Sequence, residues 1–141
     1  MNEVQIYRNA FERMMAAGGA SLIAFFSAMV WYFNPSSVSF FPVCPLYAMT
    51  GLACPGCGLT RGFHALFHGD VLTALDYNAL LPVYVFIFGY FFLSLIFVAV
   101  KGRGLSFSAF RPKFIWSFLA LSLVFAVARN LPVYPFSILY P

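Results

Sequence analysis

The chain has 141 residues, of which 62% are hydrophobic and only 9% are charged, and its mean hydropathy is +0.87. Soluble domains carry about 25% charged residues, so this composition predicts a membrane protein and leaves no room for a large soluble catalytic domain. The formal net charge of +4 does not indicate nucleic-acid binding. The eight basic residues are scattered among hydrophobic segments and form no stripe that could follow a phosphate backbone.

Three apolar segments are candidates for membrane-spanning helices. Such a helix needs about 20 mostly apolar residues, or fewer when flanking side chains snorkel to the interface. The first segment is stopped by Asn34-Pro35, and Asn78 is a candidate N-cap for the second. The third is the shortest, so we expect Lys113 and Arg129 to snorkel at its ends. The predicted spans cover about residues 16–33, 78–100 and 114–128.

The segment before the first span, residues 1–13, carries four charged residues and predicts a short interfacial helix. We interpret the first span as an anchor rather than a cleaved signal, because it ends in the bulky residues Trp31-Tyr32-Phe33 and has no small-residue cleavage site.

The distribution of Lys and Arg predicts the orientation in the membrane. In a three-span arrangement six basic residues lie on one side, and only Arg61 and Arg129 lie on the other. The sequence therefore predicts a multi-pass protein of the inner cell membrane. Its amino terminus and residues 101–113 would be cytoplasmic, whereas the loop 34–77 and the carboxy terminus would lie on the outer face.

The loop 34–77 contains all three cysteines. Its apolar part, Ser39–Met49, is expected to lie in the interface or to re-enter the membrane. A helix is predicted from about Cys57 to Phe67 and broken at Gly69, followed by a short helix over Val71–Leu75 that Asp70 could cap. The predicted fold is all-α. It is a single membrane domain, 1–141, with three transmembrane helices and a short re-entrant or interfacial helix carrying the cysteine motif.

The sequence Cys54-Pro55-Gly56-Cys57 at the start of this helix is the strongest chemical signal. Amide donors and the positive end of a helix dipole lower the pKa of a thiol, so Cys54 and Cys57 are the candidate catalytic nucleophiles. Three interpretations stay open. The cysteines could form a disulfide or a reversible redox pair in an oxidising compartment. Cys44, Cys54 and Cys57 could bind a soft metal, such as zinc, with a fourth ligand. The thiols could also be inert and buried.

The two histidines follow the cysteines at a spacing that resembles a zinc site. On one helix, however, Cys57 and His64 lie about 10.5 Å apart along the axis at 1.5 Å per residue, which is too far for one ion. We therefore interpret His64 and His68 as part of an interfacial polar face.

Ionisable and polar groups at membrane depth are costly and so are candidates for a functional site. Arg129 could pair with Asp70 or Asp76 to lock the third span to the loop, or Arg61 and Arg129 could bind an anion or a lipid headgroup. The candidate polar site comprises Thr60, Arg61, His64, His68, Asp70, Asn78, Arg129 and Asn130.

The order of these motifs resembles the small bacterial membrane-protein family catalogued as domain of unknown function 2752. The resemblance covers roughly residues 40–141 and implies a compact integral membrane protein, but it implies no activity. It rests on Cys44-Pro45, Thr50-Gly51, Cys54-Pro55-Gly56-Cys57-Gly58-Leu59-Thr60-Arg61, His68-Gly69-Asp70, Asn78, Arg129-Asn130-Leu131-Pro132 and Pro135–Leu139.

No hydrolase, phosphate-loop or metalloprotease signature is present in the sequence, so the sequence favours a non-enzyme. The leading hypothesis is a structural or accessory protein in the lipid bilayer whose outer cysteine loop is stabilised by a disulfide or a metal. Its partner would be another membrane protein or a second copy, since the small residues of Ala16–Ala20 permit close helix packing. The alternatives are a thiol–disulfide exchange protein using Cys54 or Cys57, and a lipid- or anion-binding or transport subunit using Arg61 and Arg129.

Overall fold

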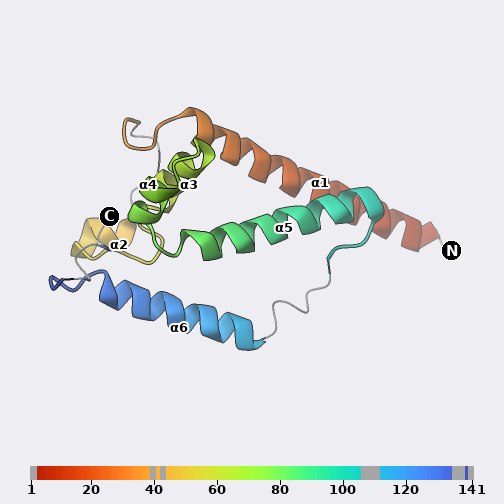
Figure 1. Ribbon diagram of the computed structural model, residues 1–141. Helices are drawn as coiled ribbons and strands as arrows, with labels where there is room; N and C mark the ends of the chain where they lie inside the picture. Colours follow the sequence, from red (N-terminus) through yellow and green to blue (C-terminus); the bar gives the residue numbers. More distant parts are fainter. Residues whose placement is uncertain (1–2, 39–40, 42–43, 106–111, 135–138, 140–141) are drawn as a thin grey trace. The chain divides into compact units, whose positions relative to one another are not determined.

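The computed structural model describes residues 3–38, 41, 44–105, 112–134 and 139. These residues form six α-helices and no strand (Figure 1), which confirms the all-α prediction. The helices are α1 (Glu3–Tyr32), α2 (Pro45–Thr50), α3 (Leu59–Phe67), α4 (Val71–Tyr77), α5 (Leu81–Lys101) and α6 (Pro112–Ala128).

Two of these helices are long and apolar enough to cross a membrane. They are Asn9–Tyr32, within α1, and Leu81–Lys101, which is α5, and they correspond to the first two predicted spans. Helix α6 is apolar but has 17 residues, or about 25 Å at 1.5 Å per residue. The structure thus supports two candidate spans, and a shorter apolar helix stands where the third is predicted.

The helix boundaries differ from the prediction at two places. Helix α1 runs without a break from Glu3, so there is no separate interfacial helix before the first span, because no proline separates the charged segment from the apolar one. Helix α5 begins at Leu81 rather than Asn78. Asn78 ends α4 instead, and its Oδ1 accepts a hydrogen bond from the Leu80 amide at 2.9 Å.

The chain divides into two compact units, each built from two separate stretches of sequence. The first comprises Met1–Met29 and Val83–Ala109. Within it, Arg13 of α1 donates from Nε to the Ala99 carbonyl at 2.9 Å and from Nη2 to the Val100 carbonyl at 3.1 Å. The last carbonyls of a helix have no partner within the helix and carry its negative dipole end, so Arg13 stabilises the carboxyl end of α5.

The second unit comprises Val30–Pro82 and Phe110–Pro141 and contains all three cysteines. Within it, α3 and α4 pack closely because Gly62 is buried, and a Cβ there would lie 3.1 Å from the Ala74 carbonyl oxygen. The chain turns between these helices at Gly69, which has a φ of +83°. Asp70 then caps α4 by accepting a hydrogen bond from the Thr73 amide at 3.1 Å, as predicted. Hydrogen bonds from the side chain and then the main chain of Thr73 lower the pKa of the Asp70 carboxyl.

A three-cysteine candidate metal centre

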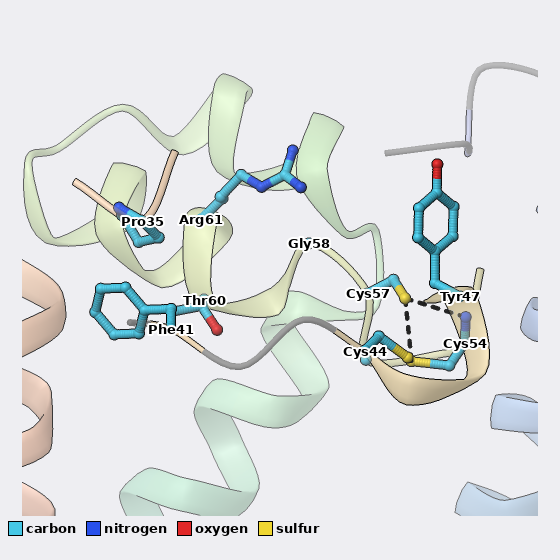
Figure 2. Close-up of a pocket in the computed structure, with 10 residues that line it drawn as sticks. Pro35, Phe41, Cys44, Tyr47, Cys54, Cys57, Gly58, Thr60 and Arg61 are labelled. Carbon is cyan, nitrogen blue, oxygen red and sulfur yellow. Dashed lines mark hydrogen bonds between the residues drawn. The ribbon is translucent and has the colours of Figure 1, made fainter. Parts of the chain in front are cut away.

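The three cysteine sulfur atoms meet where the residue before α2 lies beside the turn before α3 (Figure 2). The Sγ atom of Cys54 is 3.2 Å from that of Cys44 and 3.2 Å from that of Cys57. All three sulfurs lie within 4.8 Å of one another, and the three partly buried cysteines are free thiols. They are close enough to bind one metal ion.

The turn 54–57 presents its sulfurs through main-chain hydrogen bonds. The Cys57 amide donates to the Cys54 carbonyl at 3.0 Å, and the Cys54 amide donates to the Cys57 sulfur at 3.2 Å. Gly58 then adopts a φ of +81°, which is the left-handed region where a side chain is strained. The chain therefore reaches helical geometry only at Leu59, so Cys57 precedes α3 and does not lie in its first turn as predicted.

The pKa values of two thiols depart from their usual range in opposite directions. Burial raises the pKa of Cys57 to about 12. A hydrogen bond from the Tyr47 main chain, together with one from the Cys54 side chain, lowers the pKa of Cys44 to about 7. The expectation that a helix dipole activates Cys57 is therefore wrong, because burial outweighs it. The more readily ionised thiol of these two is Cys44.

Two buried side chains hold the carbonyl groups of this turn. Arg129, which is 1% exposed, donates from Nη1 to the carbonyls of Cys54 at 2.8 Å and Cys57 at 3.1 Å. Asn78, also 1% exposed, donates from Nδ2 to the carbonyls of Pro55 at 2.8 Å and Cys57 at 3.2 Å. Buried carbonyl groups need such partners, so these two side chains fix the cysteine turn.

Asn130 extends this support to the residue before the turn. Its Oδ1 accepts from the Ala53 amide at 2.8 Å, and its Nδ2 donates to the Ala53 carbonyl at 2.9 Å. This paired contact joins the segment after α6 to the main chain that leads into the cysteine turn. Asn78, Arg129 and Asn130 therefore act on one short stretch of main chain, residues 53–57.

The structure gives Arg129 a different environment from the predicted one. It donates to main-chain carbonyls of the cysteine turn, and its burial means that it does not snorkel. A cation–π contact adds to these bonds, because the guanidinium lies 4.9 Å from the centre of the Phe125 ring.

The thiols lie at one end of a cavity of about 410 Å³ (Figure 2). Thr60 and Arg61 line the same cavity and are exposed, and the Arg61 guanidinium lies 5.6 Å from the centre of the Tyr77 ring. Arg129 is not among the lining residues, so the two arginines do not form one open anion site. The lining comprises Pro35, Phe41, Cys44, Tyr47, Cys54, Gly56, Cys57, Gly58, Thr60 and Arg61.

The histidines lie along α3, outside the group of three sulfurs. Nδ1 of His64 is 2.6 Å from the Val30 carbonyl, and Nδ1 of His68 is 2.8 Å from the His64 carbonyl. The ring of His68 also stacks on Trp31 at a centroid distance of 6.1 Å. His64 and His68 therefore both contact the last turn of α1, through Val30 and Trp31 respectively.

Tyr47 and Ala53 also belong to the site, although the sequence did not single them out. Tyr47 lines the cavity, and Ala53 is 1% exposed and exchanges two hydrogen bonds with Asn130. Nothing in the neighbouring sequence marks either residue as part of a site, since a tyrosine in an apolar segment and an alanine before a cysteine are both ordinary features. Only their contacts with distant segments reveal their roles.

Residues 44–92 match the family model described as "Protein of unknown function (DUF2752)". The chain matches none of the curated proteins and none of the solved structures with which it was compared. The matched region contains all three cysteines and Asn78, whereas Arg129 and Asn130 lie beyond it. The predicted resemblance to this family of unknown function is therefore confirmed for residues 44–92.

Proposed function

We propose that the chain is a membrane protein that binds a thiophilic metal ion through Cys44, Cys54 and Cys57. The convergence of three sulfur atoms within 4.8 Å carries this proposal, because a disulfide uses only two thiols. Thiolate ligands select soft ions such as cuprous copper and zinc. The ion would be held by the chain's three thiolates, and the adjoining cavity leaves room for a further ligand.

Local hydrogen bonds favour ionisation of part of the cluster. The Cys54 amide donates to the Cys57 sulfur, and the main chain of Tyr47 favours the ionised form of Cys44. Burial raises the pKa of Cys57, so a bound ion must displace the proton of that thiol. The sequence contains no fourth cysteine. Among the described residues no histidine, aspartate or glutamate joins the three cysteines. A structural zinc site has four ligands, so a zinc ion held by the described residues would take its fourth ligand from a small molecule or from a partner.

We place the metal site on the outer face of the inner membrane, with α1, α5 and α6 as three spans. The six-to-two distribution of basic residues supports this orientation. Helix α6 is a few ångströms shorter than the hydrocarbon core of about 30 Å, a mismatch that local thinning of the bilayer accommodates. In this arrangement the protein is an accessory subunit that presents its ion to another membrane protein.

The proposal is tested by titrating the purified, reduced full-length protein in detergent with Cd²⁺. Thiolate ligation produces a sulfur-to-cadmium charge-transfer absorption, and we expect one ion per chain. Replacing Cys44, Cys54 or Cys57 by Ser should each weaken binding at least about tenfold, a typical cost of 1.4 kcal/mol or more for a lost ligand. Ala48→Ser, at an exposed position of α2, is the control and should bind as the wild type does. Unchanged binding in all three cysteine variants would contradict the proposal.

A second candidate function, thiol–disulfide exchange, is favoured by the position of Cys54 in contact with both other sulfurs. Starting from a Cys54–Cys57 disulfide, the Cys44 thiolate would attack the Cys54 sulfur and form a Cys44–Cys54 bond. Cys57 would leave as a thiolate and take a proton from water, with no net oxidation. The raised pKa of Cys57 makes it a poor leaving group. Metal binding is preferred because it uses all three sulfurs at once.

Intact mass under non-reducing conditions separates the two functions. A disulfide lowers the mass by two hydrogen atoms and is reversed by a reductant, whereas a bound ion adds its own mass and is removed by a chelator. Exchange is further expected to form a mixed disulfide with oxidised glutathione, with release of one reduced glutathione, in the double variant Cys54→Ser, Cys57→Ser, because no neighbouring thiol is then left to resolve it. A mass equal to that of three thiols, with no trapped adduct, would exclude exchange.

A further inference from the structure

His64 and His68 bring two imidazole rings together at the end of α3. His64 lies in the last turn of this helix, and His68 is the residue that directly follows it. A spacing of four residues places two side chains one above the other on the same face of a helix, and the centres of the two rings are 4.4 Å apart. Two histidines at this spacing on one helix are a known arrangement of zinc ligands.

Main-chain carbonyls fix which nitrogen of each ring carries the proton. Nδ1 of His64 lies 2.6 Å from the Val30 carbonyl oxygen, and Nδ1 of His68 lies 2.8 Å from the His64 carbonyl oxygen. A carbonyl oxygen can only accept, so a neutral ring donates from Nδ1 and keeps a lone pair on Nε2. Within the described part of the chain, the hydrogen bonds of both rings use Nδ1. Such a bond orients a histidine to bind a metal ion through its other nitrogen.

The separation of the rings suits one ion. A zinc–nitrogen bond is about 2.0–2.1 Å long, so two nitrogens on one ion lie at most about 4.2 Å apart. Nε2 lies on the rim of its ring, so rings with centres 4.4 Å apart can meet this limit. Among the described residues, no carboxylate or thiol joins the two histidines in a group of three candidate ligands. Water or a small molecule would fill the other coordination positions, as in an open metal site.

The last turn of α1 holds both rings. Val30 accepts the hydrogen bond from His64, and the ring of Trp31 stacks on His68 at an interplanar angle of 14°. Rings that are already held lose little conformational freedom when they bind an ion. His64 is half-buried and His68 is exposed, so an ion can reach the pair from the surface.

We infer that Nε2 of His64 and Nε2 of His68 form a second metal site, which takes a divalent cation of borderline softness such as Zn²⁺, Ni²⁺ or Cu²⁺. Neutral imidazole is the ligand that suits these ions. The site goes beyond the proposed function, because it uses none of the three thiols and lies outside their group. Either site can therefore fail its test while the other binds.

Trp31 makes the histidine site visible, because a paramagnetic ion quenches the fluorescence of an indole close to it. The chain has two tryptophans, and Trp116 is 69% exposed, so Trp116→Phe leaves Trp31 as the only indole at little cost. The reduced full-length protein with this change is titrated in detergent with Ni²⁺. We expect saturable quenching that a chelator reverses. Mg²⁺, a hard ion of the same charge, should leave the fluorescence unchanged.

His64→Asn and His68→Asn, in the same background, test the two ligands. Asparagine keeps an amide donor near the place of Nδ1 and removes Nε2, so the hydrogen bond to the carbonyl can remain. Each change should raise the Ni²⁺ concentration at half-quenching at least about tenfold, because linked ligands bind far more tightly than one alone. Loss of the stacking contact alone would change the intensity of Trp31 but not this midpoint. Cys54→Ser is the control and should leave the midpoint unchanged.

An absence of Ni²⁺ quenching, or an unchanged midpoint in His68→Asn, would overturn the inference. If His64→Asn does not fold, His68→Asn carries the test, because His68 is exposed. A midpoint that rises in Cys54→Ser but not in the histidine variants would place the quenching ion at the cysteines and would also overturn it. The Cd²⁺ titration of the cysteine variants separately decides the proposed function.

Discussion

Cys44 and Cys57 differ in the ease with which they lose a proton, although their sulfurs belong to one cluster. The pKa of Cys44 is lowered to about 7 by hydrogen bonds, and that of Cys57 is raised to about 12 by burial. In the metal-free protein at pH 8, iodoacetamide should therefore modify Cys44 rapidly and Cys57 slowly, because the thiolate is the nucleophile. The Cys44 rate should level off above pH 8, while the Cys57 rate keeps rising to pH 10. Peptide mass spectrometry measures both rates, and faster labelling of Cys57 would contradict the assignment.

Gly58 is required by the backbone at the start of α3, where its φ is +81°. Gly58→Ala should lower the free energy of unfolding by about 1–2 kcal/mol, the cost of placing a Cβ in the left-handed region. It should also weaken Cd²⁺ binding. Gly56→Ala is the matched control within the same turn, since Gly56 has no positive φ and its Cβ would make an ordinary 3.9 Å contact with the Cys54 sulfur. Denaturation in detergent measures the free energy of unfolding of both variants. An equal loss of stability in Gly58→Ala and Gly56→Ala would refute the argument from the positive φ of Gly58.

At the level of single residues, the sequence singled out the three cysteines that lie together, but it did not predict which side chains hold their turn. Cysteine is a metal ligand by residue type, and Cys44, Cys54 and Cys57 lie within 14 positions of one another. The sequence was therefore enough to suggest that they could form a metal site. The hydrogen bonds of Arg129 to the turn were not predicted. They join residues 72 and 75 positions apart, and a search for an oppositely charged partner suggested Asp76 instead. Every residue has a main-chain carbonyl, so the sequence does not show which of them will accept a hydrogen bond from a distant side chain.

At the level of elements, the close approach of α3 and α4 depends on Gly62. Its Cβ would lie 3.1 Å from the Ala74 carbonyl oxygen and 3.5 Å from the Leu81 side chain, so Gly62→Ala should destabilise the protein by about 1–3 kcal/mol through overpacking. Gly89→Ala in α5, where nothing lies within 4 Å, should be neutral or stabilising by up to about 1 kcal/mol. Thermal unfolding in detergent compares the two, and a stable Gly62→Ala would show that the helices can move apart.

Local signals predicted α3 and α4 well, because Gly69 and Asp70 act on their immediate neighbours. They failed at Asn78, which resembles an N-cap for the next helix but ends α4 and holds the cysteine turn. They also failed at residues 3–13, where charge suggested a separate helix but nothing in the sequence stops α1. Charge influences where a helix lies in a membrane, whereas breakers determine where it ends.

For the whole molecule, the number of membrane spans is the open prediction. Three spans place the two ends of the chain on opposite sides, whereas the two long helices of the structure alone place them on the same side. An alkaline phosphatase reporter, active only outside the cytoplasm, should be active when fused after residue 134 and inactive when fused between residues 102 and 105. Activity at neither position would leave α6 outside the membrane and contradict the three-span arrangement.

The apolar segments were enough to predict the all-helical class, since each approaches the length of about 20 residues that a membrane-spanning helix needs. They could not decide the status of α6, because a 17-residue helix is close to the minimum length of a span. Hydropathy is calculated for one segment of sequence at a time, so it cannot predict burial that depends on contacts with other segments. The burial of Arg129 at the end of α6 depends instead on the rest of its unit.

The hydrogen bonds from Arg129 to the cysteine turn also set the order in which the protein can be completed during synthesis. The turn leaves the ribosome more than 70 residues before Arg129, given separations of 72 and 75 residues. A nascent chain that lacks α6 would therefore hold its cysteine turn without Arg129 and Asn130, through Asn78. Its three thiols would meet metal ions or oxidants before their turn is complete.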